Sequence, residues 1–268
     1  MRYALHRGEG FLLITGKPGT GKTTLVKELL GELEMTRFKV STLVSTQLEA
    51  DDLLRSVAYA YDLPVESTNK ATIIQYLRNY LIRRNHNRLR TILIVDEAQD
   101  LPSSALEELR LLTNLEQDNK PLLQVFLVGQ PRLNELLGAS SMEQLRQRIT
   151  VATAMQPLSA DEVEAYIQHR LTVAGWIHDP EIDKEVYGFI HEYSRGIPRQ
   201  INLVCSRLLL HGYVEEKHSL DLDDMTAVVN DLAEEQLAMS HCRPVKKPEM
   251  DVKELTKDPV VTSIVHLH

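Results

Sequence analysis

The sequence Gly16-Lys-Pro-Gly-Thr-Gly-Lys-Thr-Thr24 is a complete G-x-x-x-x-G-K-[ST] phosphate-binding loop, the Walker A motif, and it is the strongest indication of the fold. It follows an apolar run, 11–15, that predicts a short buried strand, and it precedes a stretch, 24–30, with the apolar spacing of an amphipathic helix. A strand, a glycine-rich turn and a helix in this order hold the phosphates of a nucleotide. We therefore expect a nucleoside triphosphate to bind here.

The residue types of the loop explain why it suits phosphate. Glycines at 16, 19 and 21 let the backbone turn so that successive N–H groups point at phosphate oxygens. Lys22 is expected to contact the β- and γ-phosphates, and the Thr23 hydroxyl is expected to bind Mg²⁺. The residues predicted to contact the nucleotide are Gly16, Lys17, Pro18, Gly19, Thr20, Gly21, Lys22, Thr23 and Thr24.

A second motif limits the reaction that this nucleotide undergoes. The apolar run 92–95 ends in two adjacent carboxylates, Asp96 and Glu97. Ligands of open α/β sheets bind at the carboxyl ends of strands, so Asp96 is predicted to hold Mg²⁺ through water and Glu97 to polarise the attacking water. The adjacent Glu favours hydrolysis over transfer to a small acceptor, and the absence of an Asn-Lys-x-Asp segment argues against GTP. ATP hydrolysis to ADP and phosphate is the leading prediction.

Strands and helices alternate up to residue 156. The pattern predicts strands at 11–15, 38–44, 91–95, 122–128 and 150–154, helices at about 50–60, 70–85 and 103–117, and a short helix from Pro131. Such alternation implies right-handed crossovers and a parallel sheet with helices on both faces. The fold class that we expect is therefore α/β, a P-loop NTPase whose parallel sheet is flanked by helices.

Beyond residue 156 the periodicity becomes helical. Helices are predicted at about 159–174, 180–194, 198–213 and 223–238, the first with a capping box from Ser159 to Glu162 and the last with Asp223 as its cap. We expect a nucleotide-binding domain at 1–156, a small all-α domain at 157–238 and a flexible tail at 239–268.

The composition bounds the cellular setting. The two cysteines, Cys205 and Cys242, have no C-x-x-C spacing, which favours a reducing compartment, and Cys205 is predicted to be a core residue. No stretch approaches the roughly 18 apolar residues that span a bilayer, and the first residues lack a signal-peptide pattern. We expect a cytoplasmic protein, associated with the inner membrane at most through partners.

The formal net charge of −8 is unevenly distributed, since residues 157–237 hold 6 Lys and Arg against 16 Asp and Glu, whereas residues 1–156 hold 19 against 18. This balance argues against a generally basic nucleic-acid binder.

Several segments, taken in order, resemble the general secretion pathway protein A family of AAA+ ATPases, including its exosortase-associated relatives. The resemblance covers about residues 3–237 and rests on the segments 8–16, 96–100, 106–116 and 128–131, with further matches at 145–149, 156–158 and 196–199. It implies an AAA+ P-loop NTPase whose all-α domain is a lid. It also implies a homo-oligomer with nucleotide at the subunit interfaces, serving a secretion or envelope export machine.

The resemblance assigns three further residues. Gln130 matches the sensor that contacts the γ-phosphate or the attacking water, and its alternative role is to cap the loop before Pro131. Arg148 resembles the arginine finger that reaches a neighbouring subunit, with Arg146 as the runner-up. Arg199 matches the second sensor arginine on the lid, although it is alternatively a surface residue at a helix start.

The sequence departs from the family pattern at both ends. Relatives usually carry some tens of residues before the equivalent of Tyr3, including a segment that helps to form the adenine pocket. Many relatives also continue into a membrane-spanning segment and a peptidoglycan-binding domain. We expect this sequence to lack these parts, and a misassigned start codon or a fragment would explain the first departure.

Two other functions remain open. A transposition-helper or replication-initiator type of AAA+ protein would bind DNA, and a basic cluster before the second motif would then contact phosphates. The cluster comprises Arg78, Arg83, Arg84, Arg88 and Arg90, although a solvated helix end and loop is its simpler interpretation. A scaffold that binds nucleotide without hydrolysing it is the third function, disfavoured because Lys22, Thr23, Asp96 and Glu97 are all present.

Overall fold

The computed structural model describes residues 8, 10–31, 37–44, 48–66, 68–118 and 120–241. Its centre is a five-stranded parallel sheet with the order β2-β3-β6-β1-β7. These strands are β1 (Phe11–Gly16), β2 (Phe38–Val44), β3 (Arg90–Asp96), β6 (Leu123–Gly129) and β7 (Ile149–Met155). The predicted strands and the parallel sheet flanked by helices are confirmed.

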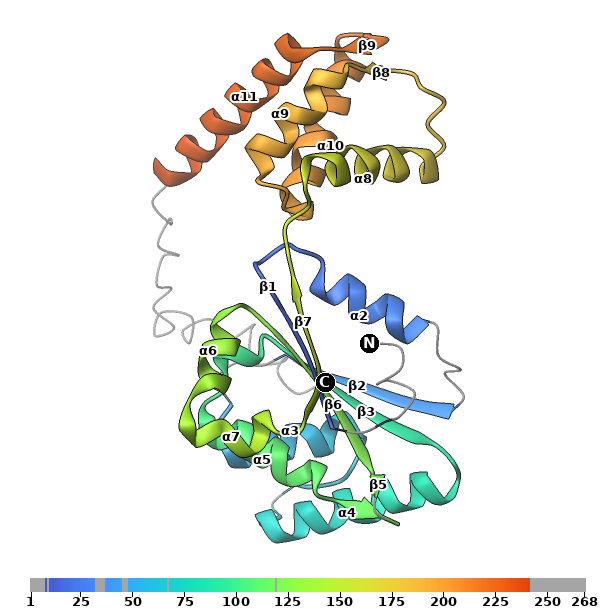
Figure 1. Cartoon of the computed structure of the whole chain (residues 1–268), viewed down its shortest axis with the longest axis vertical. Coiled ribbons are helices and arrows are strands. Elements are labelled where there is room, and N and C mark those ends of the chain that lie inside the picture. The colour runs from blue at the N-terminus through green and yellow to red at the C-terminus, as the bar shows by residue number, and fades with distance from the viewer. Residues whose placement is uncertain are drawn as a thin grey trace, which may run out of the picture.

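Helices cover both faces of this sheet (Figure 1). One face carries α2 (Lys22–Gly31), which packs against Leu12, Ile14 and their neighbours. The other face carries a larger set: α3 (Ala50–Ala60), α4 (Lys70–His86), α5 (Ser103–Thr113), α6 (Arg132–Gly138) and α7 (Glu143–Arg146), with the 3₁₀ turns η2 (Ala98–Asp100) and η3 (Ser140–Met142). Because both faces are covered, all six residues of β1 are buried, which explains its continuous apolar run.

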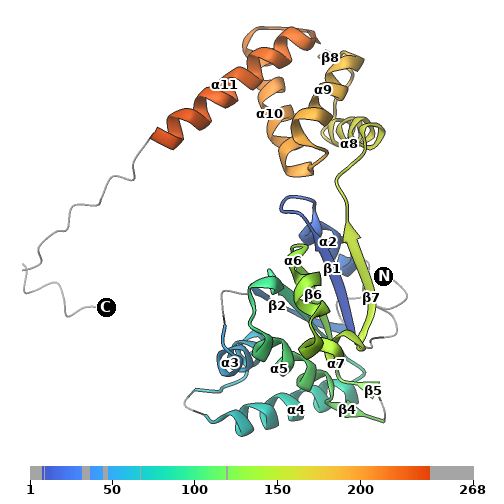
Figure 2. The same cartoon turned by 60° about the vertical axis from the view of Figure 1, so that its left-hand side comes forward.

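The remaining helices pack on one another above the sheet (Figures 1 and 2). They are α8 (Ala160–Val173), α9 (Lys184–Ser194), α10 (Pro198–Val214) and α11 (Leu222–His241). Their buried side chains, such as Val163, Ile190 and Leu208, form a core cluster distinct from the two clusters that flank the sheet. The chain enters this helical part directly from β7, through the capping box that the sequence predicts at Ser159 and Glu162.

Two short strand pairs correct the predicted helix limits. The helix predicted at 103–117 ends at Thr113, because β4 (Glu116–Gln117) pairs with β5 (Lys120–Pro121) in an antiparallel hairpin. The helix predicted at 180–194 begins only at Lys184, because β8 (Glu181–Ile182) pairs with β9 (Ser219–Leu220). The part predicted to be all-α therefore contains a small parallel ladder. Such two-residue strands leave no periodic signal to find in a sequence.

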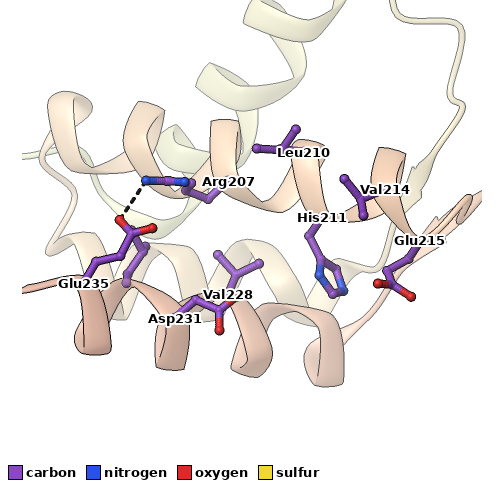
Figure 3. Close-up of a pocket in the computed structure, with 9 residues that line it drawn as sticks. Arg207, Leu210, His211, Val214, Glu215, Val228, Asp231 and Glu235 are labelled. Atoms are coloured by element: carbon purple, nitrogen blue, oxygen red, sulfur yellow. Dashed lines mark hydrogen bonds and ion pairs between the residues drawn. The ribbon is translucent and has the colours of Figure 1, made fainter. Parts of the chain in front are cut away.

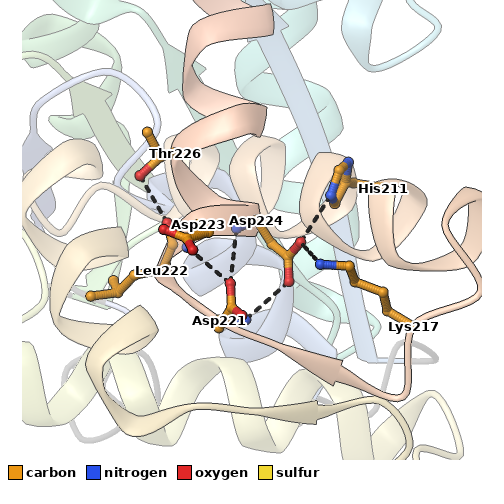
Figure 4. Close-up of polar contacts among 7 residues, drawn as sticks. All are labelled: His211, Lys217, Asp221, Leu222, Asp223, Asp224 and Thr226. Carbon is orange, nitrogen blue, oxygen red and sulfur yellow. Dashed lines mark hydrogen bonds and ion pairs between the residues drawn. The ribbon is translucent and has the colours of Figure 1, made fainter.

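The prediction of Asp223 as the cap of the last helix is wrong. The helix begins at Leu222, and the carboxylate of Asp221 accepts hydrogen bonds from the main-chain N–H groups of Asp223 and Asp224 at 2.9 and 3.0 Å (Figure 4). Adjacent aspartates offer several equivalent caps, so sequence alone does not place the first turn.

Asp224, in the first turn of α11, links the start of this helix to α10 and to the segment before the helix. Its side chain is 3% exposed, pairs with Lys217 and lies 3.1 Å from His211 Nε2 (Figure 4). Burial alone would raise the pKa of Asp224, but hydrogen bonds from Lys217, from the main chain and from His211 outweigh burial and lower this pKa.

One of the two cysteines lies in the described part of the chain. Cys205 is a free thiol packed against the core of the helical part, as predicted, and burial raises its pKa to about 12. Cys242 and the tail from residue 242 lie outside the described residues. None of the helices in the described ranges combines the length and apolar character that crossing a membrane requires.

Candidate nucleotide-binding site

A cleft of about 820 Å³ lies between the carboxyl edge of the sheet and the helical part. The phosphate loop and α2 form one wall, while Tyr166 and Arg170 of α8 and Arg199 of α10 line the other. The cleft thus brings the first sequence motif together with residues far along the chain.

The loop has the geometry that the glycines predict. Gly19 and Gly21 adopt positive φ angles of 82° and 90°, which residues with side chains rarely adopt. Thr20 closes the turn by donating from Oγ1 to the Lys17 carbonyl at 2.8 Å. Helix α2 begins at Lys22, so its positive end and the loop face the same space.

Lys22 is held inside the loop. The residue is 7% exposed, and its Nζ donates to the carbonyl oxygens of Gly16 at 3.0 Å and Lys17 at 3.2 Å. These main-chain contacts keep the buried ammonium at the N-terminus of α2, where its charge adds to the positive end of the helix dipole. A polyphosphate would meet both there.

Thr23 and Asp96 form the pair that suits a divalent cation. Thr23 Oγ1 donates to Asp96 Oδ2 at 3.3 Å, and the other carboxylate oxygen accepts from the Glu97 main chain at 2.9 Å. Two hard oxygens beside a phosphate site fit Mg²⁺, which keeps most of its waters and needs few protein ligands. Among the described residues, no three His, Cys, Asp or Glu side chains come together as a metal-binding group.

Glu97 and Gln130 meet at the ends of two neighbouring strands. Glu97 adopts a left-handed conformation, with φ 51° and ψ 39°, that is strained for a non-glycine residue. Gln130, directly after β6, donates from Nε2 to Glu97 Oε2 at 3.3 Å. Gln99 donates to the same oxygen at 2.7 Å and accepts from the Gln130 main chain at 2.8 Å. Gln99 lies in the segment 96–100 that carries the family resemblance, but the sequence alone indicates no role for it.

Arg199 joins this edge from the helical part. Its main-chain N–H donates to the Gly19 carbonyl at 3.2 Å, and a Cβ placed on Gly19 would lie 2.8 Å from Arg199 Cβ. The start of α10 therefore touches the phosphate loop directly. Gly196, with φ 68°, makes this approach possible, because its carbonyl accepts from Leu158 N–H at 2.8 Å in a turn too tight for a side chain.

Three further residues of the cleft were missed by sequence reasoning. Tyr166 donates from its hydroxyl to Asn202 Oδ1 at 3.1 Å, and Arg170 Nη1 donates to the Tyr166 hydroxyl at 3.3 Å. This polar wall faces the loop across the cleft. The four-residue spacing of Tyr166 and Arg170 places them on one face of α8, but that spacing alone does not separate a cleft wall from a solvated face.

Arg148 lies at the amino ends of the parallel strands, opposite to the carboxyl ends where the phosphate loop lies. It directly precedes β7, whose first residue pairs with Phe11 at the start of β1, and its carbonyl accepts from Phe11 N–H at 2.9 Å. The phosphate loop follows the other end of β1, one strand length or about 20 Å away. Arg146 lies near the same edge and pairs with Glu143. The structure thus brings Lys22, Thr23, Asp96, Glu97, Gln130 and Arg199 together but not Arg148.

The predicted basic cluster divides in the structure. Arg78, Arg83 and Arg88 are exposed on α4 and the loop that follows, whereas Arg84 and Arg90 are half-buried. The Arg90 guanidinium stacks over the Phe38 ring at 5.1 Å. Part of the cluster therefore supports the sheet.

A smaller cavity of about 290 Å³ lies between α10 and α11, away from the loop (Figure 3). Its wall includes Leu210 and Val214, and Arg207 pairs across it with Glu235 at 2.8 Å. None of the motifs contributes to its lining, so the large cleft is the candidate site.

Comparison with known sequences agrees with this geometry. Residues 5–137 match the family model of the AAA domain. The chain is 38% identical over 227 residues to General secretion pathway protein A of Aeromonas hydrophila, a match that covers 84% of this chain. It covers 41% of that relative, so the chain spans about two fifths of the relative's length.

Solved structures show the same fold at low sequence identity. The Aeropyrum pernix ORC2 protein in its ADP form superposes with a TM-score of 0.64 at 15% identity, over 85% of this chain and 64% of that one. The Thermotoga maritima RuvB Holliday junction branch migration motor has a TM-score of 0.56 at 19% identity, over 86% and 65%. These likenesses concern the fold alone.

Proposed function

This chain is an AAA+ protein related to general secretion pathway protein A, and from that premise we propose that it binds ATP with Mg²⁺ and hydrolyses it to ADP and phosphate. One observation carries the proposal. Lys22, Thr23, Asp96, Glu97 and Gln130 come from three separate segments and meet at the edge where β1, β3 and β6 end. A site that only bound nucleotide would need no carboxylate and amide pair beside the loop.

In the proposed reaction the loop binds and the strand ends catalyse. Main-chain N–H groups of the loop and Lys22 neutralise the phosphate oxygens. Glu97 takes a proton from a water whose oxygen bonds to the γ-phosphorus, while the bond to the β,γ-bridging oxygen breaks and ADP leaves with that electron pair. Gln130 holds the water or the γ-phosphate in line. Mg²⁺, held by Thr23 and through water by Asp96, would supply positive charge against the phosphate oxygens.

We also propose roles for the two arginines and the helical part. Residues 157–238 act as a domain that closes over the cleft, carrying Arg199 toward the γ-phosphate, while residues 1–156 form the nucleotide-binding domain. Contact between Arg199 and the loop supports this role. Arg148, at the far edge of the sheet, acts on the nucleotide of a neighbouring copy. The working form is therefore a homo-oligomer with nucleotide at the interfaces between copies.

The cellular setting follows from the curated relative. We propose that this chain powers a secretion or envelope export machine from the cytoplasmic side of the inner membrane, where partners hold it. Support comes from the 38% identity to General secretion pathway protein A. The alternative function, on DNA, gains little from the structure, because two of the five basic-cluster residues are half-buried beside the sheet.

Turnover of ATP tests the setting. Steady-state hydrolysis is measured for the protein alone, with duplex DNA and with membrane or cell-wall fractions. We expect stimulation by the envelope fractions and none by DNA. Stimulation by DNA that falls steeply with salt would instead establish the DNA-binding alternative, because such salt dependence is the signature of phosphate contacts.

The Glu97→Gln variant tests the chemistry. It removes the proton acceptor but keeps the shape of the side chain, so ATP binding should persist while hydrolysis falls about 10²-fold to 10⁴-fold. ATP should then hold the oligomer together, which light scattering measures. Hydrolysis at the wild-type rate would show that another group accepts the proton.

A further inference from the structure

Gln99 connects Glu97 and Gln130, the two residues that we propose to act on the attacking water. Its Nε2 donates to Glu97 Oε2 at 2.7 Å, and its Oε1 accepts from the Gln130 main chain at 2.8 Å. The Gln130 side chain donates to the same Glu97 oxygen at 3.3 Å. The three residues form a closed ring of hydrogen bonds between the end of β3 and the end of β6.

We propose that Gln99 is a positioning residue for ATP hydrolysis, which fixes the carboxylate of Glu97 and the main chain of Gln130 in one relative geometry. The inference rests on the proposed function. Because Gln99 and Gln130 both donate to Oε2, the geometry leaves Oε1 as the oxygen that takes the proton from water. Gln99 touches neither nucleotide nor water in this scheme and acts through Glu97.

The surroundings of Gln99 suit a fixed support. Gln99 is 6% exposed, and both the Nε2 and the Oε1 atoms of its side-chain amide have hydrogen-bond partners. Glu97 stands on a strained backbone of φ 51° at the start of η2, where the turn alone does not set the direction of its side chain. A buried amide with two partners restricts the carboxylate at little further cost in entropy.

Gly129 provides the space for this amide. A Cβ at residue 129 would lie 2.6 Å from Gln99 Oε1 and 3.0 Å from Leu133 Cδ2. The backbone at Gly129 does not have a positive φ, so its conformation does not explain a glycine at this position. The close approach of the Gln99 side chain explains it instead.

Gln124 offers a matched control for the loss of a buried glutamine. It is 2% exposed near the start of β6, whereas Gly129 ends this strand, and its Oε1 accepts from Arg90 Nη2 at 3.4 Å. Replacing Gln99 or Gln124 by Leu removes a buried amide in either case. Only the first replacement removes a contact to Glu97.

The experiment measures nucleotide affinity with a fluorescent ATP analogue and hydrolysis in a single turnover. Gln99→Leu should keep the affinity within about twofold and lower the rate about 10-fold to 100-fold, as loss of a supporting hydrogen bond does elsewhere. Gln124→Leu should keep both values. Gln99→Asn retains the amide but is one methylene too short to reach both partners, so it should also lower the rate. A wild-type rate in either Gln99 variant, or an equal fall in Gln124→Leu, would overturn the inference.

A double-mutant cycle separates positioning from a general structural role. If Gln99 acts through Glu97, adding Gln99→Leu to Glu97→Gln lowers the rate no further. A further fall of the same size would mean that Gln99 acts elsewhere. Failure of the proposed function looks different, because then the wild-type protein does not hydrolyse ATP or Glu97→Gln hydrolyses at the wild-type rate.

Discussion

The sheet-bearing part and the helical part line the same cleft but hold their residues differently. At the carboxyl ends of the strands, side-chain hydrogen bonds join Thr23 to Asp96 and Gln130 to Glu97, and the Asp96 carboxylate also accepts from the Glu97 main chain. Arg199 comes from a separately packed group of helices and meets the loop through its main chain. The sheet therefore fixes the side chains that we propose to act on water and Mg²⁺ relative to one another. The place of the Arg199 side chain relative to this group depends instead on the position of α10.

The largest effect should come from the sheet-bearing part, through Lys22→Ala. This variant removes the ammonium that lies at the start of α2, so ATP binding and hydrolysis should both be lost. Isothermal titration with ATP and Mg²⁺ measures the affinity, and the melting temperature without nucleotide checks the fold. Unchanged ATP affinity in a folded variant would show that the phosphate site does not lie in the sheet-bearing part.

The Arg148→Ala variant tests whether a residue of the sheet-bearing part acts on the nucleotide of a neighbouring copy. Arg148→Ala should keep nucleotide binding and lower hydrolysis about 10²-fold to 10³-fold, the size of losing one donor to a developing charge. Mixing Arg148→Ala with Glu97→Gln subunits should restore part of the activity, because the second variant supplies an intact arginine to the first.

Arg146→Ala is the matched control for this experiment, since Arg146 lies near the same edge and already pairs with Glu143. It should hydrolyse ATP like the wild type. If Arg146→Ala is the inactive variant and the mixture restores it, the finger is Arg146. If mixing restores neither, the reaction needs no residue from a second copy.

Arg199 should show a smaller effect, because it joins the site only when α10 is close. Arg199→Ala removes a charged hydrogen bond to phosphate, which corresponds to roughly 10-fold to 100-fold in rate, and affinity for ADP should change less than affinity for ATP. Arg199→Lys keeps the charge and should recover part of the rate. Equal loss of ADP and ATP affinity would show that Arg199 supports the loop rather than the γ-phosphate.

Strand positions and the phosphate loop could be predicted because their signals are local. The buried run before Gly16, the glycine pattern and the acids at 96 and 97 each occupy a few consecutive residues. The parallel sheet followed from the alternation of strands and helices. The ends of two helices were not predicted, because the hairpin after Thr113 has strands of only two residues and the β8–β9 pair joins residues that are far apart in the sequence.

Contacts across the fold explain what the sequence did not predict. Gln99 stands beside Glu97 in the sequence, but its link to Gln130 exists only because β3 and β6 are neighbours. Tyr166 and Asn202 line the cleft because α8 and α10 pack together. Single-sequence periodicity indicates which face of each helix is buried but not which helices meet.

The smallest effect should appear as a difference in acid stability between the two parts. The pKa of Asp224 is lowered in the folded helical part, so its charge stabilises folding above the unfolded value of about 4, and this stabilisation is lost as the pH falls through the lower folded value. Trp176, the chain's single tryptophan, lies in the helical part and bonds to the Pro180 carbonyl at 3.0 Å. Its fluorescence therefore reports on that part alone.

On acidification the Trp176 signal and the hydrogen-exchange protection of α10 and α11 should be lost before protection of β1 and β6. Asp224→Asn should be about 1 kcal/mol less stable at neutral pH, because a charged hydrogen-bond acceptor is replaced, and its acid step should be smaller. If β1 loses protection first, or if Asp224→Asn keeps the full acid step, another carboxylate governs the acid response. A helical part that opens first would mean that closure over the cleft can change while the reacting groups on the sheet stay in place.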